Sequence, residues 1–115
     1  MTDQQQLFYR DLKRIKYLDQ AIKENPGVQE YVLEKDKTVV TLCNIVIGYG
    51  MEEAQKEIDM SDEETYSQIR QLLYMKILDH LYGYDPVKEE PQVYYGRFFR
   101  ETIAEYKEGQ KCRGI

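Results

Sequence analysis

The sequence predicts an all-α fold, organised as one small domain of four to five helices over residues 1–109 with a flexible tail at 110–115. Two observations lead to this prediction. Apolar residues recur at steps of three and four along most of the chain, which is the period of one helical face. Residues that start or stop helices separate these stretches. A chain of 115 residues that is 42% hydrophobic is also long enough to bury a core without disulfides.

The first helix is expected over residues 3–24. Thr2 and Gln5 have the spacing of a capping box, in which each side chain hydrogen-bonds the other residue's backbone N–H. The tripeptide that begins at Asn25 ends the helix, because Pro26 cannot continue it. One apolar stripe runs along this helix and consists of Phe8, Leu12, Ile15, Leu18 and Ile22.

Residues 28–47 allow two interpretations. Their apolar residues fit a helix with one gap, at Lys35, and we favour this interpretation. Seven of the ten residues from Thr38 to Ile47 are β-branched, however, which favours strands. A hairpin here would make the fold α+β, although no other segment offers a third strand to support it.

The middle of the chain is expected to contain a break and two helices. Gly48-Tyr49-Gly50 predicts the break, and a short helix follows over residues 51–58. Ser61 begins a second capping box, which opens a helix that runs to about Tyr82, with Gly83 as its cap. The apolar arc of this helix is the widest in the chain, so we expect it to be the central and most buried helix. Its apolar residues are Tyr66, Ile69, Leu72, Leu73, Met75, Ile77, Leu78 and Leu81.

The last helix is expected over residues 92–108, and Gly109 ends it. Its inward stripe contains Tyr95, Phe99, Ile103 and Tyr106.

Charge is distributed unevenly along the chain. The whole sequence has 16 basic and 21 acidic residues, for a net charge of −5. The segment 51–64 has one basic and seven acidic residues, so it alone carries −6. A chain of this charge is a poor nonspecific ligand for nucleic acid, and we interpret the segment as a docking surface for a protein partner with a basic surface. Its acidic residues are Glu52, Glu53, Glu57, Asp59, Asp62, Glu63 and Glu64.

The last helix offers a second candidate surface, because tyrosine is frequent in this chain. The sequence has 11 Tyr and no Trp, and Tyr and Arg are common in protein interfaces. Acidic residues dilute the positive charge of this helix, so we expect protein contact or self-association into a homodimer rather than nucleic acid binding. The residues that we expect to make this contact are Tyr94, Tyr95, Arg97, Phe98 and Arg100.

No motif indicates catalysis, a metal site or a cofactor. His80 is the single histidine and has no cysteine or second histidine at ligand spacing. Cys43 lies in an apolar run and Cys112 in the tail, which is typical of a reducing compartment rather than of a disulfide framework. The chain has no apolar run long enough for a membrane span and no signal peptide, so we expect a cytoplasmic protein that is not an enzyme.

Residues 51–73, MEEAQKEIDMSDEETYSQIRQLL, resemble the helix-turn-helix of sigma-factor region four and of phage late-transcription regulators. Ile58, Met60, Thr65 and Ile69 are at positions that this family usually keeps apolar, and Ser61 is at the capping position. The resemblance implies a DNA-binding transcriptional regulator. Two departures oppose this function: Gln55 stands where alanine is usual, and the helix expected to read DNA begins with three acidic residues.

Together these features predict a small non-enzymatic binding protein that regulates or inhibits a larger macromolecule through protein contact. Inhibitors of this class, with an acidic surface that mimics DNA, are encoded by bacteriophages and mobile elements. A helix-turn-helix DNA-binding regulator is the alternative.

Overall fold

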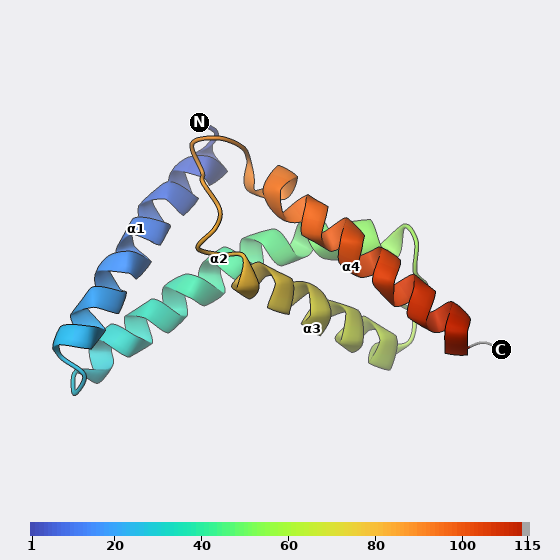
Figure 1. Cartoon of the computed structure of the whole chain (residues 1–115), viewed down its shortest axis with the longest axis horizontal. Coiled ribbons are helices and arrows are strands. Elements are labelled where there is room, and N and C mark those ends of the chain that lie inside the picture. The colour runs from blue at the N-terminus through green and yellow to red at the C-terminus, as the bar shows by residue number, and fades with distance from the viewer. Residues whose placement is uncertain (114–115) are drawn as a thin grey trace.

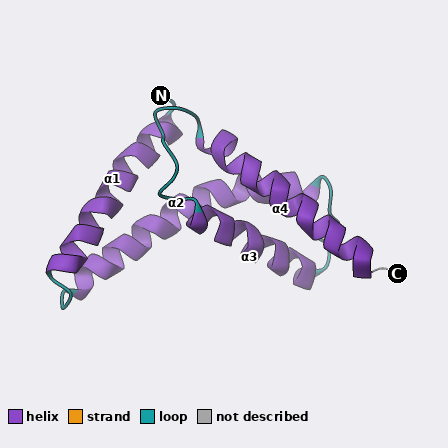
Figure 2. Ribbon diagram, viewed as in Figure 1, coloured by secondary structure: helices purple, strands orange, loops and turns teal. Residues whose placement is uncertain are grey.

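Four helices follow one another in the computed structural model, which describes the backbone of residues 1–113 and the side chains of residues 1–110. They are α1 (Asp3–Glu24), α2 (Gln29–Gln55), α3 (Glu63–Asp79) and α4 (Pro91–Arg113). Figure 2 shows loops and no strand between these helices in the described part of the chain. The all-α prediction is therefore confirmed, and the hairpin alternative for residues 28–47 is wrong because Val28 is the N-cap of α2 and the rest of that segment lies inside this helix.

The start of α1 follows from its sequence. The Thr2 hydroxyl accepts a hydrogen bond from the Gln5 backbone N–H at 3.2 Å, and the Gln5 side-chain oxygen accepts one from the Thr2 N–H at 2.7 Å. This is the predicted capping box. The Gln5 amide also donates to the carbonyl of Pro86 at 2.8 Å, in a buried position. One residue thus fixes both the start of α1 and the loop before α4.

The long helix α2 occupies the centre of the molecule, since it packs against α1, α3 and α4 (Figure 1). The prediction that the helix after Ser61 is central is therefore wrong. The β-branched residues of α2 do not prevent helix formation. The hydroxyls of Thr38 and Thr41 donate to the carbonyls of Glu34 and Lys37, each at 2.8 Å, so they bond to the helix itself.

The expected break at Gly48 to Gly50 is also wrong, because α2 continues through it to Gln55 and includes the first part of the predicted 51–58 helix. Gly50 is buried where the other helices approach α2 closely. A Cβ atom at this position would lie 3.1 Å from Leu73 Cδ1 and 3.2 Å from Phe99 Cδ2. This glycine therefore permits close packing and does not terminate a helix.

The ends of α3 differ from the prediction by a few residues. Asp62, and not Ser61, is the N-cap, and its side chain accepts a hydrogen bond from the Thr65 N–H at 3.3 Å. The helix ends at Asp79 with His80 as its C-cap, before the predicted Tyr82.

The last helix begins at Pro91 and continues through Gly109 to Arg113. Gly109 does not have the positive φ of a helix-ending glycine, so the helix passes through it. The end of the predicted tail, residues 114–115, lies outside the described residues.

The four helices bury one apolar core. Leu73 and Ile77 are fully buried in it, as predicted, and so is Cys43. Each helix contributes one stripe, and the main contributors are Phe8, Leu12 and Ile15 from α1, Leu42, Cys43 and Val46 from α2, Ile69, Leu73 and Ile77 from α3, and Tyr95, Phe99 and Ile103 from α4.

The molecule is elongated and measures 54 × 34 × 20 Å. Its radius of gyration is 16.4 Å, whereas a compact chain of about 100 residues has about 13 Å. Figure 1 shows the cause: the C-terminal part of α1 and the first half of α2 form an arm that extends away from α3 and α4. Leu18 and Ala21 are buried in this arm, apart from the main core cluster. An elongated shape leaves more helix surface without an intramolecular partner.

A small polar network fastens the arm to the body of the molecule. Lys35 Nζ lies 2.6 Å from Asp19 Oδ1, and the Tyr82 hydroxyl donates to Asp19 Oδ2 at 3.0 Å. Burial alone would raise the pKa of Asp19, but the hydrogen bonds from Lys35 and Tyr82 and the nearby lysine charges outweigh it and lower that pKa. The hydrogen bond with Asp19 raises the pKa of Lys35.

We expect Asp19→Asn to reduce the free energy of unfolding at pH 7 by about 0.5–1 kcal/mol, since the ion pair is partly exposed. The folded pKa of Asp19 is below its unfolded value of about 4, so its contribution is present above pH 4 and lost as pH falls through the folded pKa. Urea unfolding from pH 7 down to pH 2 should therefore show the two proteins converging. Asp36→Asn, at an exposed position, is the control, and equal effects of both changes would contradict a role for the network.

Candidate functional site

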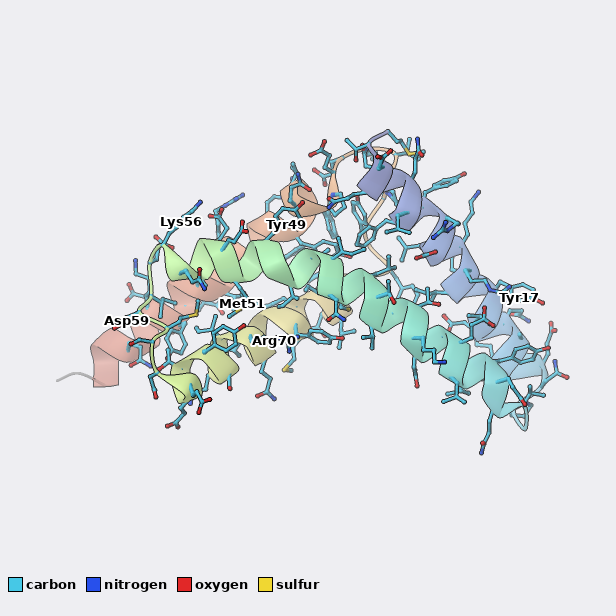
Figure 3. The ribbon with its side chains drawn as sticks, turned by 180° about the vertical axis from the view of Figure 1, so that it is seen from behind. Tyr17, Tyr49, Met51, Lys56, Asp59 and Arg70 are labelled. Atoms are coloured by element: carbon cyan, nitrogen blue, oxygen red, sulfur yellow. The ribbon has the colours of Figure 1, made fainter. Side chains whose placement is uncertain are left out.

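The seven carboxylates predicted as a docking surface lie around the connection between α2 and α3, at one end of the molecule. We call this group the acidic turn, and it consists of Glu52, Glu53, Glu57, Asp59, Asp62, Glu63 and Glu64. Figure 3 shows Lys56 and Asp59 at this end, whereas Tyr17 lies at the other end, on the arm.

Four of these carboxylates have local partners. Glu53 pairs with Lys56 at 3.1 Å and Glu57 with Lys107 at 3.6 Å, both on the exposed surface. Asp59 accepts a hydrogen bond from the backbone N–H of Ser61, which lowers the pKa of Asp59, and Asp62 caps α3. The two lysines offset only two of the seven negative charges, so most of the negative potential remains.

The other three carboxylates, Glu52, Glu63 and Glu64, are exposed and have no hydrogen bond or ion pair within residues 1–110. Glu63 and Glu64 lie in the first turn of α3, where the helix dipole favours negative charge. The fold does not otherwise use these groups, which leaves them available to a partner.

The second predicted surface, on α4, needs one correction. Tyr95 is fully buried and cannot contact a partner in the folded chain. Its ring packs 5.5 Å from that of Tyr84 and 6.4 Å from those of Phe8 and Phe99, and burial raises the pKa of Tyr95. The physical reason is its position on the same α4 stripe as Phe99, which faces the core.

Two of the remaining α4 residues contact His80 at the C-terminal end of α3. The Tyr94 hydroxyl donates to the carbonyl of His80 at 3.3 Å, and the Phe98 ring stacks on His80 with centroids 3.7 Å apart. Arg97 pairs with Glu89, whereas Arg100 is exposed without an ion pair among the described side chains. The contacts with His80 stabilise the α3–α4 packing, and a docking role for these residues stays a prediction.

A further surface was not predicted. Leu72, Met75 and Leu78 of α3, and Tyr82 just beyond its end, are exposed by 40%, 51%, 42% and 50%, and we call them the outer α3 face. The sequence analysis assigned the first three to a buried stripe, which is wrong because α2 and α4 cover only the side of α3 that carries Ile69, Leu73 and Ile77. The wide apolar arc of this helix was the sequence signal for the surface. The width of the arc does not show which of its residues the other helices leave exposed.

Hollows flank the outer α3 face on both sides. One of 640 Å³ lies between α3 and α4, and Leu72, Met75 and Tyr106 contribute to its lining. Another of 510 Å³ lies between α2 and α3 and is lined in part by Val40, Leu78 and Tyr82. The face is thus an apolar ridge between two grooves.

The described residues contain no constellation of catalytic type. No group of three or more His, Cys, Asp or Glu side chains within them is arranged to hold a metal ion. The Cys43 thiol is buried, which raises its pKa and opposes thiolate chemistry. None of the four helices, as far as they are described, combines the length and the apolar character needed to cross a membrane.

The segment that resembles a helix-turn-helix differs from that motif in the length of its connection and in the charge of its second helix. Its first part is the end of the long helix α2, and residues 56–62 connect it to α3. A helix-turn-helix usually has a turn of roughly three to four residues. Ile58 and Met60 pack against the core, while the first turn of α3 exposes acidic side chains where a DNA reader exposes neutral or basic ones.

Comparisons with protein-family models, with curated protein sequences and with solved structures found no match for this chain. Its surfaces are therefore the basis for a functional proposal.

Proposed function

We propose that this chain is a small non-enzymatic binding protein that regulates or inhibits a larger macromolecule by docking its acidic turn against a basic protein surface. One observation carries the proposal. Three carboxylates without partners project at one end of an elongated molecule, in a segment of charge −6, while the remainder of the chain is close to neutral.

The physical argument is electrostatic. Grouped carboxylates produce a negative potential that attracts surfaces rich in Lys and Arg and accelerates encounter with them. Basic grooves that normally hold nucleic acid are surfaces of this kind. A cytoplasmic inhibitor that mimics the charge of DNA, of the type that phages encode, is the specific form of this proposal.

We expect the triple variant Glu52→Gln, Glu63→Gln, Glu64→Gln to bind its partner roughly tenfold more weakly at low salt, chiefly through a slower association rate. The partner is first captured from a lysate of the source cells with the wild-type protein, and the rates are then measured on a sensor surface. Wild-type affinity should fall as salt shortens the screening length from about 10 Å.

The matched control is the triple variant Asp3→Asn, Glu30→Gln, Glu101→Gln. It removes the same amount of charge, and Asp3 and Glu30 also lie in first helical turns, so it reproduces the effect on helix dipoles. Equal binding of both variants would contradict docking through the acidic turn. A partner that binds duplex DNA and this chain at the same time would contradict DNA mimicry, and a shift of duplex DNA by this chain alone would favour the DNA-binding alternative.

A further inference from the structure

We propose that a second copy of this chain covers the outer α3 face, with the two α3 helices running antiparallel and crossing near Met75. This self-association goes beyond the proposed function, because it uses a surface that is separate from the acidic turn. The observation behind it is that α3 exposes large apolar side chains on its outer side, with Leu72, Met75 and Leu78 each exposed by 40% or more. Such a contiguous apolar surface marks an interaction site.

The order of residues on this face suits pairing with itself. Leu72 and Leu78 stand three positions on either side of Met75. In an antiparallel pair centred on Met75, Leu72 of one copy lies at the level of the partner's Leu78, and the two Met75 side chains meet. The same patch thus serves on both subunits, as a two-fold interface requires.

The charges at this face also permit a second copy. The whole chain carries −5, so two copies repel each other unless they meet at a surface of low charge. The hollow beside α4 is lined by one lysine, Lys76, and by two carboxylates, Asp79 and Glu105, so its lining carries only one net negative charge. Gln71 lines the same hollow, and in the antiparallel pair its amide lies at the level of the partner's Asp79, where it can donate a hydrogen bond.

The acidic turn selects the antiparallel orientation. Glu63 and Glu64 stand at the start of α3, so parallel pairing would bring the acidic turns of both copies together. In an antiparallel pair that crosses at Met75, the two copies of Glu63 are separated along the helices by twice the rise from Glu63 to Met75, which is roughly 36 Å. This distance exceeds the screening length of about 8 Å at physiological salt.

The hollows supply the contact area that one helix face lacks. Stable dimers bury about 800 Å² on each subunit, which is more than a single helical stripe provides. The grooves of 640 Å³ and 510 Å³ on either side of the ridge can receive side chains of the second copy, as in ridges-into-grooves packing. The resulting dimer would carry its two acidic turns at opposite ends and could bind two basic surfaces at once.

The first test is the mass of the protein in solution. Sedimentation equilibrium should give a concentration-dependent mass that approaches twice the 13.8 kDa of one chain. Met75→Glu should weaken dimerisation by roughly 100-fold or more, since it buries two unpaired carboxylates. Val93→Glu is the matched control, because Val93 is exposed by 48% on α4 and lines neither groove. Circular dichroism verifies that both variants remain helical.

The second test measures orientation by crosslinking, in a Cys112→Ser background in which Cys43 is buried. A mixture of chains that carry Leu72→Cys or Leu78→Cys should be joined by a short bismaleimide mainly as mixed pairs. Preferential linking of Leu72→Cys chains to each other would indicate parallel pairing and overturn the orientation. A monomer at all concentrations, or a dimer that Met75→Glu leaves intact, would overturn the proposal itself.

Discussion

Replacing Leu73 by alanine should lower the free energy of unfolding by about 2–5 kcal/mol. Leu73 is fully buried where α2, α3 and α4 meet. The change removes the transfer free energy of the side chain and leaves a cavity, because three helices cannot all move inward to fill it. Urea unfolding followed by circular dichroism measures the loss.

Leu33→Ala is the matched control for this prediction. Leu33 is also a helical leucine, but it is exposed by 58%, so its removal should change stability by less than about 0.5 kcal/mol. Similar effects of the two changes would mean that the helices do not pack around Leu73 as described.

Gly50→Leu should destabilise the protein by about 1–3 kcal/mol, because it forces extra atoms into a filled space. Even a Cβ at this position would lie 3.1 Å from Leu73 Cδ1 and 3.2 Å from Phe99. The larger side chain must therefore push α3 and α4 away from α2. Thermal and urea unfolding measure the effect.

Gly48→Leu provides a control with an expected effect of opposite sign. A Cβ at Gly48 would meet nothing within 4 Å, and this residue lies in the same helix. Leucine should therefore stabilise α2 by about 0.5–1 kcal/mol through its higher helix propensity. Stabilisation by both substitutions would show that the helices do not approach closely at Gly50.

Local signals predicted α1 almost completely. Its capping box, its apolar stripe and its proline stop all act within a few residues, so the sequence contains all the information that they need. The start and end of this helix, after Thr2 and at Glu24, agree with the prediction.

Tertiary packing decided the parts of α2 that the sequence left open. Gly48 and Gly50 have low intrinsic helix propensity, which favours a break. The contacts of α2 with three other helices outweigh that preference, and Gly50 lets these helices approach closely because a Cβ there would crowd Leu73 and Phe99. Such a role depends on residues far away in sequence, so local reasoning assigned it to a turn.

The candidate surfaces likewise differ in whether local sequence or tertiary packing determines them. The place of the acidic turn at the surface was predictable because its seven carboxylates fall within one short segment and charged groups stay at the surface. The outer α3 face was not predictable, since an apolar arc around Leu72 and Met75 fits burial by the chain's own helices as well as burial by a partner. Tyr95 was placed on the inward stripe by its helical phase and also on a contact surface by its residue type; its burial confirms the first prediction and contradicts the second.

Because only the first half of α2 lies in the arm, backbone amide protons along this helix should exchange with solvent at different rates. Leu42 and Val46 lie in the common core, so their amide protons exchange with deuterium only when the whole domain opens. Near the 25–28 turn, α2 has only α1 to hold it, and amide protons there can exchange through local fraying. Exchange should therefore slow steadily from residue 29 towards residue 46 along one continuous helix. The end of the arm can open and close while the acidic turn and the outer α3 face remain folded.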